Sequence, residues 1–224
     1  MAISGCRGVQ SALDPAGPAA AAIAQIWWVM LAGSVAIFAL VMACLVWAMR
    51  RRQGLRDPSR LVLLGGLVMP TVVLLALLIY GTVSGRQVVA WGQSSDRIVE
   101  VDARQWEWEF RHLDEQGAAT RRSINTLVMP AGELVEFRIG SDDVIHSFWV
   151  PRLGGKIDAI PGRVNTLRLR ADTPGRMRGQ CAEFCGLEHT HMAFDVVVLP
   201  AQDYARWLRG DDIAGLNIAT EPPR

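Results

Sequence analysis

Two long apolar runs constrain the fold of this chain more than any other feature of its sequence. Residues Ile23–Met49 are almost entirely apolar, and a second run of the same kind covers Leu61–Val83. Each run exceeds the roughly 20 residues with which an α-helix crosses about 30 Å of hydrocarbon. Neither run has the polar face of a helix in a soluble core. We therefore predict two transmembrane helices, within a hairpin that covers residues 23–90.

The connection between the two runs is short and strongly basic. It contains Arg50, Arg51, Arg52, Arg56 and Arg60. Arginines beside a short loop stay on the cytoplasmic side of a membrane. The hairpin therefore predicts a multi-pass protein of a bacterial inner membrane with both termini in the periplasm. Pro70 interrupts the second run, and we expect it to kink the helix because it cannot donate a hydrogen bond to the preceding turn.

The N-terminal segment allows two hypotheses. Residues 1–22 are predicted to be a flexible lead-in, since Ser11–Ala22 is rich in Ala, Pro and Gly. Within it, Ile3–Cys6 resembles the end of a bacterial lipoprotein signal, after which cleavage leaves a lipidated cysteine, although the charged and apolar regions of such a signal do not precede it. Cys6 is thus either a lipid anchor in a chain that starts upstream of Met1, or an incidental thiol.

From about Arg97 the pattern changes to short segments rich in β-branched and aromatic residues, bounded by turn residues. The segments predicted as strands are Arg97–Ala103, Gln105–His112, Leu134–Gly140, His146–Val150, Asn165–Arg170 and Ala193–Leu199. Many short strands predict a sandwich or barrel over residues 91–210. We expect a helix at Gln202–Arg209 and a tail at residues 211–224. The net charge of +1 gives no electrostatic basis for binding nucleic acid.

A compact set of metal donors lies in the last third of this domain. It runs Cys181-Ala-Glu-Phe-Cys185-Gly-Leu-Glu-His189-Thr-His-Met192. Thiolate and thioether groups select copper over hard cations, and imidazole also suits copper. We expect His146, at a distant strand end, to be a further ligand. A mononuclear blue-copper site uses one Cys; two thiolates can bridge two coppers, each completed by one His, with Met192 and the carbonyl of Glu183 in the weak positions.

Alternatives remain open for this set. Cys181 and Cys185 could form a disulfide in an exported domain, and a zinc site is also chemically possible. Neither alternative explains a methionine at this offset from the histidine. His191 could compete with His189 for the metal, whereas His112 has no metal-binding neighbours in the sequence and is predicted to lie on the surface.

Four blocks of sequence together resemble subunit II of haem-copper cytochrome c oxidase. They are Gln105–Trp108, Asp143–Trp149, Lys156–Arg163 and Cys181–Met192. The resemblance implies a two-helix transmembrane hairpin followed by an all-β cupredoxin-like sandwich. It also implies a dinuclear copper A centre with the ligands His146, Cys181, Glu183, Cys185, His189 and Met192. Because quinol-oxidising relatives lack these ligands, cytochrome c is the implied electron donor.

The resemblance implies a role for several single residues. Electrons would arrive from cytochrome c at Trp106 and pass to haem in subunit I, where oxygen is reduced, so this chain itself performs electron transfer. Trp108 suits packing in the sandwich. Glu183 and Asp158 would lie near a magnesium ion at the contact with subunit I, and Arg163 near the haem propionates. Subunit III is a further expected partner.

Acidic residues near the predicted copper loop suggest a docking surface for a basic cytochrome c. They are Glu107, Asp142, Asp143 and Glu188.

The chain departs from the family at Glu107, where tyrosine is usual, at His191, where an aromatic residue is common, and at Leu63, where a glutamate usually serves a proton path. A rival function is a membrane-anchored copper-delivery protein that binds one Cu(I) through two cysteines.

Overall fold

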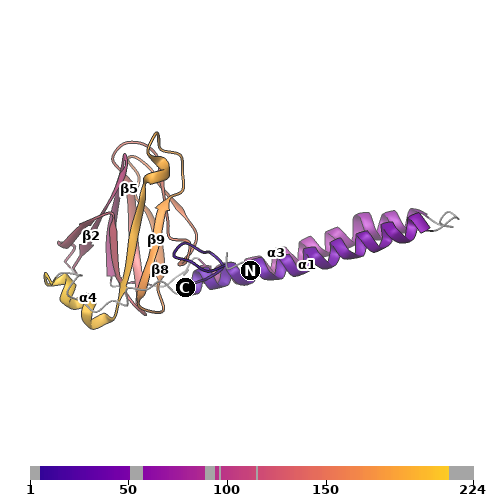
Figure 1. The fold of residues 1–224 in the computed structure, drawn as a ribbon, viewed down its shortest axis with the longest axis horizontal. Coiled ribbons are helices and arrows are strands. Elements are labelled where there is room, and N and C mark those ends of the chain that lie inside the picture. The colour runs from indigo at the N-terminus through magenta and orange to yellow at the C-terminus, as the bar shows by residue number, and fades with distance from the viewer. Residues whose placement is uncertain (1–5, 51–57, 89–93, 96, 115, 212–224) are drawn as a thin grey trace, which may run out of the picture. The chain divides into compact units, whose positions relative to one another are not determined.

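The computed structural model describes residues 6–50, 58–88, 94–95, 97–114 and 116–211. The chain divides into two compact units, which are described separately below. One unit comprises Gln25–Arg86, and the other comprises Met1–Ala24 together with Gln87–Arg224. Figure 1 shows a helical hairpin in the first unit and a two-layered β-structure in the second.

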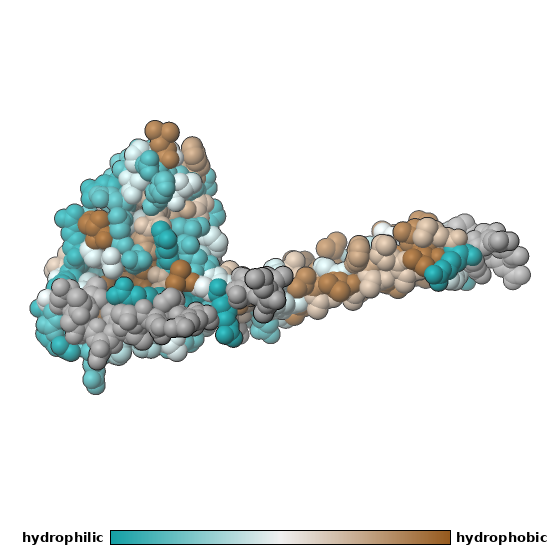
Figure 2. All heavy atoms as spheres, viewed as in Figure 1, coloured by the Kyte–Doolittle hydropathy of each residue, from teal (hydrophilic) through white to brown (hydrophobic). Residues whose placement is uncertain are grey.

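The helical unit confirms the two predicted apolar helices. Its first helix is the part of α1 (Pro18–Arg50) from Gln25 onward. The second helix consists of α2 (Pro58–Leu61), η1 (Val62–Val68) and α3 (Met69–Val88) in succession. The stretches Pro18–Arg50 and Ser59–Arg86 are long and apolar enough to cross a membrane. Large side chains such as Phe38 and Leu74 are exposed along them, and Figure 2 shows this apolar surface. Lipid or apolar partner surfaces must cover these side chains in the cell, since water would not solvate them favourably.

The irregularity that the sequence predicts around Pro70 is a π-helical stretch directly before it. In η1 the backbone widens, and the amide of Met69 bonds to the carbonyl of Leu64. Such wide turns are a recognised way for a helix to absorb a local break in its hydrogen bonding. Leu63 lies in this stretch with an exposed side chain.

The β-unit is a sandwich of two five-stranded sheets, as predicted. The first sheet has the order β3-β2-β1-β5-β8 and the second β4-β10-β9-β6-β7. The strands are β1 (Arg97–Arg104), β2 (Glu107–Leu113), β3 (Ala119–Ile124), β4 (Thr126–Pro130), β5 (Leu134–Ser141), β6 (His146–Trp149), β7 (Ile157–Ala159), β8 (Asn165–Arg170), β9 (Gly175–Cys181) and β10 (Ala193–Leu199). Both sheets mix parallel and antiparallel pairs, with β1 parallel to β5 and β4 parallel to β10.

An aromatic core fills the space between the sheets. Trp108 and Phe110 of β2, Phe148 of β6 and Phe194 of β10 are almost completely buried. The rings of Phe148 and Phe194 stack with centroids 5.2 Å apart, and Trp108 lies 5.5 Å from Phe194. Aromatic pairs at these separations add to the stabilisation from burial alone. This core holds β6, which begins at His146, and β10, which follows the predicted metal loop.

The helix α4 (Ala201–Leu208) corrects one expectation about His112. The imidazole of His112 is 1% exposed, its Nδ1 lies 2.9 Å from the hydroxyl of Tyr204, and its ring centroid lies 4.7 Å from that of Trp207. Burial lowers the pKa of His112 to about 3. The predicted surface position is therefore wrong, because α4 covers this residue.

The flexible lead-in predicted for residues 1–22 is wrong for the described part of that segment. Residues 6–17 lie against the β-unit: the amide of Ala16 donates to the carbonyl of Arg152 at 2.7 Å, and Asp14 forms an ion pair with Arg152 at 3.0 Å. Gly17 packs so closely that a Cβ would lie 2.0 Å from the carbonyl oxygen of Arg170. Small residues thus allow close packing here, where the composition suggested disorder. The predicted C-terminal tail lies outside the described residues from position 212 onward.

Candidate metal centre

The pairing of β6 with β9 brings the predicted ligands together. His146 is the first residue of β6, Cys181 is the last residue of β9, and Phe148 pairs with Cys181 across the two strands. The loop from Cys181 to β10 contains the short 3₁₀ helix η2 (His189–His191) and carries the other donors. The loop therefore closes over the end of β6, where His146 stands.

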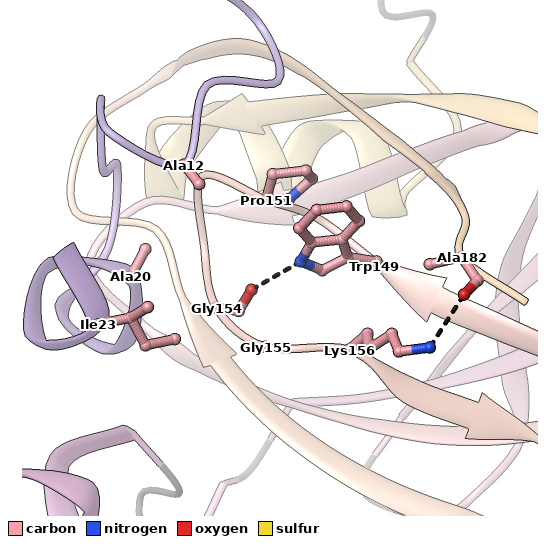
Figure 3. Close-up of a pocket in the computed structure, with 9 residues that line it drawn as sticks. All are labelled: Ala12, Ala20, Ile23, Trp149, Pro151, Gly154, Gly155, Lys156 and Ala182. Atoms are coloured by element: carbon pink, nitrogen blue, oxygen red, sulfur yellow. Dashed lines mark hydrogen bonds between the residues drawn. The ribbon is translucent and has the colours of Figure 1, made fainter. Parts of the chain in front are cut away.

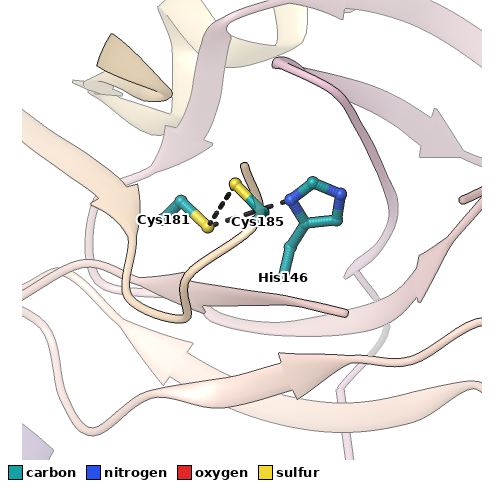
Figure 4. Close-up of side chains that lie close together, drawn as sticks. All are labelled: His146, Cys181 and Cys185. Carbon is teal, nitrogen blue, oxygen red and sulfur yellow. Dashed lines mark hydrogen bonds between the residues drawn. The ribbon is translucent and has the colours of Figure 1, made fainter. Parts of the chain in front are cut away.

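The two thiols lie side by side. The Sγ atoms of Cys181 and Cys185 are 3.8 Å apart, and Nδ1 of His146 lies 3.9 Å from Sγ of Cys181 (Figure 4). A disulfide requires about 2.05 Å between the sulfur atoms. Both cysteines are free thiols, so the disulfide alternative is not formed in the structure.

The remaining donors surround the same pair of sulfur atoms. Nδ1 of His189 lies 3.6 Å and Sδ of Met192 lies 3.7 Å from Sγ of Cys185. The carbonyl oxygen of Glu183 lies 3.2 Å from Sγ of Cys181. Each sulfur atom of the pair thus has one imidazole and one weaker donor beside it. All six donors that the sequence predicts are brought together.

His191 does not take part in this set. Its side chain is 79% exposed, and its Nδ1 lies 2.8 Å from a carboxylate oxygen of Glu188. Because η2 points successive side chains in different directions, only His189 faces the thiols. This arrangement favours His189 over His191 as the donor.

The surroundings of the two thiols shift their pKa values in opposite directions. Burial raises the pKa of Cys181, but hydrogen bonds to His146 and to the backbone at Glu183 and Ser147 outweigh it and lower this pKa to about 6. Burial and the neighbouring charge of Cys181 raise the pKa of Cys185. A cation between the sulfur atoms would stabilise both thiolates and release the remaining proton. The donor set therefore fits a bound metal ion.

The carboxylate of Asp143 contacts the ring nitrogen of His146 that does not face Cys181. Its Oδ1 lies 2.9 Å from Nε2 of His146, and its Oδ2 accepts a 2.7 Å hydrogen bond from the backbone amide of Gln105. Metal-binding histidines usually donate their second ring N–H to such a carboxylate. The sequence assigned Asp143 to a docking surface and missed this contact, although its spacing of three residues from His146 is a signal that could have indicated it.

Two tryptophans near the loop differ in their surroundings. Trp106 is half-buried, and its indole Nε1 donates to the carbonyl of Cys185 at 3.3 Å. Trp108 is fully buried, with its ring centroid 6.1 Å from that of His146. Trp106 is therefore the tryptophan that joins the surface to the loop, whereas Trp108 belongs to the core.

The other face of the loop lies beside a small pocket. Lys156 donates to the carbonyl of Ala182 at 2.9 Å and lies 3.8 Å from the carboxylate of Glu183. Figure 3 shows Lys156 and Ala182 in the wall of this pocket, together with Trp149, whose indole donates to Gly154. Asp158 lies on β7, and the side chain of Arg163 is exposed. The magnesium and propionate roles of these residues remain predictions.

The chemistry of the donors favours copper. Two thiolates, two imidazoles, a thioether and a carbonyl are soft or borderline ligands for the most part, and hard cations prefer oxygen-rich sites. Zinc accepts thiolate and imidazole but has no need of a buried thioether. Met192 is 1% exposed beside Cys185, which favours copper over zinc.

Fold and site together define a class of proteins: β-sandwich domains with a candidate metal site, in a chain that also contains an apolar helical hairpin. Residues 90–199 match the model of the family described as cytochrome C oxidase subunit II, periplasmic domain. The chain belongs to the cytochrome c oxidase subunit II family, and it is a membrane-anchored member with a cupredoxin-like domain.

Relatives with curated names agree with this assignment. Cytochrome c oxidase subunit 2 of Alkalihalophilus pseudofirmus is 32% identical over 231 residues, which cover 93% of this chain and 64% of the relative. Heme-copper oxidase subunit 2 of Aeropyrum pernix is 36% identical over 119 residues, which cover 52% of this chain and 50% of the relative. The chain thus spans between about half and two thirds of the length of these relatives.

A solved structure is also similar. The periplasmic domain of subunit II of the cytochrome oxidase of Bradyrhizobium japonicum has 28% sequence identity and a TM-score of 0.48. The similarity covers 52% of this chain and 93% of that domain.

Proposed function

We propose that this chain is the electron-input subunit of a haem-copper terminal oxidase. It accepts electrons from cytochrome c at a dinuclear copper A centre and passes them to haem in subunit I, where oxygen is reduced. The observation that supports this most strongly is the pair of free thiols 3.8 Å apart, with an imidazole and a weaker donor beside each. Subunits I and III of the oxidase are its partners in the membrane.

Six residues of this chain would hold the copper. They are His146, Cys181, Glu183 through its backbone carbonyl, Cys185, His189 and Met192. Copper held by these residues would supply one-electron transfer, and sharing the electron between two metals would keep the rearrangement on reduction small. The chain contributes a buried, preformed donor set, since both thiols are 4% exposed and His146 is completely buried.

Trp106 is the residue at which we propose that electrons arrive. It is half-buried, so one part of the indole faces solvent and a docked donor. Its Nε1 contacts the carbonyl of the ligand residue Cys185. The side chain therefore offers a short connection from the surface to the metal loop.

The proposed location is a bacterial inner membrane, with the copper domain and both termini in the periplasm. The arginine-rich connection at residues 50–60 supports this orientation. A lipid on Cys6 would add an anchor on the same side, and the Cys6 side chain is exposed. Magnesium near Glu183 and Asp158 would mark the contact with subunit I.

The decisive experiment loads the full chain, purified in detergent, with copper. We expect a purple protein with two coppers per chain and a one-electron EPR signal delocalised over both metals. A Cys185→Ser variant should lose this signal because one bridging thiolate is missing. One copper per wild-type chain, or a colourless product, would contradict the dinuclear centre.

A copper-delivery protein is the second candidate. The observation in its favour is that the two thiols are free and close together, which suits capture of a single Cu(I). Such a protein would bind one Cu(I) per chain and release it to an acceptor. Binding of one Cu(I) that is unaffected by His189→Ala and Met192→Leu would favour delivery over electron transfer.

A further inference from the structure

Gln105 occupies the turn between β1 and β2, on the opposite sheet from the metal loop. Its backbone amide donates to Oδ2 of Asp143 at 2.7 Å. The other oxygen of Asp143 lies 2.9 Å from Nε2 of His146. Through its backbone, Gln105 therefore supports the first ligand-bearing segment, which carries His146.

The side chain of Gln105 reaches the second ligand-bearing segment. Its Nε2 donates to the carbonyl of Cys185 at 2.7 Å, which makes this a shorter contact than the 3.3 Å bond from Trp106 to the same oxygen. Neither donor belongs to the loop. The carbonyl of Cys185 is thus held by two consecutive residues of the turn that joins two strands of the other sheet.

Gly186 makes room for this contact. Its φ of +119° is rarely adopted by residues with a side chain, and a Cβ there would lie 2.9 Å from Nε2 of Gln105 and 3.2 Å from Cζ2 of Trp106. The amide and the indole therefore pack directly over the backbone of the loop. The glycine after Cys185 has a physical reason to be glycine.

We propose that Gln105 is a positioning residue that clamps the segment of His146 to the segment of Cys185. The ladder between β6 and β9 ends at Cys181, where the chain leaves the sheet, and the loop beyond it needs other restraints to stay closed. The Gln105 clamp supplies one at the residue that carries the second thiol. It keeps the donor set assembled before any metal binds.

The proposal for Gln105 rests on the proposed function only because that function identifies the loop as metal-binding. Its test therefore uses metal-free protein. Cys181 and Cys185 are each 4% exposed, and a thiol reagent reaches them only when the loop opens. A lost hydrogen bond shifts such an opening equilibrium by about fivefold to tenfold. The reduced, metal-free full chain in detergent should therefore alkylate Cys185 about five to ten times faster in Gln105→Leu than in wild type. Exposed Cys6 is the internal reference.

Two further variants separate the hydrogen bond from general disturbance. Gln116→Leu is the matched control, because Gln116 is exposed on the β2–β3 turn and, among the described residues, its side chain forms no hydrogen bond with either ligand-bearing segment. It should alkylate Cys185 at the wild-type rate. Gln105→Lys keeps an N–H donor of similar reach. Hydrogen–deuterium exchange over residues 182–191 should therefore be faster than wild type in Gln105→Leu, but should stay within about twofold of wild type in Gln105→Lys.

Opposite outcomes would overturn the clamp. Alkylation of Cys185 in Gln105→Leu at the wild-type rate would show that the amide does not restrain the loop. Faster loop exchange in Gln105→Lys, equal to that in Gln105→Leu, would show that shape rather than donation matters. Copper counting tests the proposed function separately: one copper in wild type would contradict the dinuclear centre and leave the alkylation result for the clamp unaffected.

Discussion

Oδ1 of Asp143 lies 2.9 Å from Nε2 of His146, while Nδ1 of the same ring faces Sγ of Cys181 at 3.9 Å. If Nε2 carries the proton, the carboxylate fixes the ring orientation and leaves Nδ1 free to bind a metal. Burial lowers the pKa of His146, but the hydrogen bonds to Cys181 and Asp143 outweigh it and raise this pKa overall. One exposed carboxylate therefore orients the buried imidazole of His146.

Asp143→Ala should weaken copper binding by about 10- to 100-fold, because the imidazole of His146 loses its fixed orientation. Competition with a chelator of known affinity measures the change in the full chain. Asp142→Ala is the matched control: Asp142 is the neighbouring exposed carboxylate, and its side chain forms no hydrogen bond or ion pair with the other described residues. Equal affinity in Asp143→Ala and Asp142→Ala would contradict the orienting role.

The ionic-strength dependence of turnover should change when Asp142 is neutralised. Of the acidic residues predicted to dock cytochrome c, Glu107 pairs with Arg104 at 2.6 Å, and Glu188 pairs with His191. Asp142 is the exposed member without such a partner in the described chain. Asp142→Asn should therefore flatten the ionic-strength dependence of turnover in the assembled oxidase, since exposed charges mainly speed encounter.

The control for docking is a carboxylate on α4. Asp203→Asn changes the net charge by the same amount at a different element, where Asp203 pairs with Arg206. Its salt profile should match that of wild type. A wild-type profile in Asp142→Asn would argue against docking at this surface.

The two tryptophans should respond differently to substitution. Trp106→Phe should slow electron arrival from cytochrome c and change the stability of the domain little, because Trp106 is half-buried at the edge of β2. Trp108→Ala should cost about 3–5 kcal/mol of stability, because it empties a completely buried site. Stopped-flow reduction and urea unfolding measure the two effects. Loss of stability alone in Trp106→Phe would contradict its proposed role in electron transfer.

That these six donors lie together could be predicted because they are chemically distinctive and most of them are local in sequence. Five of the six lie within Cys181–Met192, and the sixth begins a strand with clear β character. The supports of the site could not be found in the same way. Gln105 reaches Cys185 across 80 positions, and no composition or periodicity encodes that contact.

The predicted strands did not include β3, β4, β7 and β9, and for β3 and β9 the physical reason is clear. β3 is a polar edge strand with mostly exposed residues, so it lacks an apolar alternation. β9 contains two glycines and two arginines, which are poor strand formers or neutral ones by propensity. Gly179 is needed there because a Cβ would lie 2.1 Å from the ring of Phe194 on the neighbouring strand. Tertiary packing, rather than local preference, decides this segment.

His112 gives a pH prediction with a definite sign. Its pKa is about 3 in the folded chain, because burial under α4 disfavours the charged ring, and about 6.5 when the chain is unfolded. Below pH 6.5 the unfolded state binds a proton that the folded state does not, so stability falls as the pH falls. Well above pH 6.5 the residue contributes no pH dependence. Between pH 7 and pH 5 we expect a loss of about 2 kcal/mol from this residue.

Urea unfolding of the full chain in detergent, followed by tryptophan fluorescence, tests this at several pH values. His112→Gln should be less stable than wild type at pH 7, because it loses the ring contacts to Tyr204 and Trp207. Its stability should then fall less steeply toward pH 5, so that the gap to wild type narrows by about 2 kcal/mol. His191→Gln removes an exposed imidazole and should keep the wild-type slope. A His112→Gln slope identical to that of wild type would mean that the buried ring is not what makes the domain acid-sensitive.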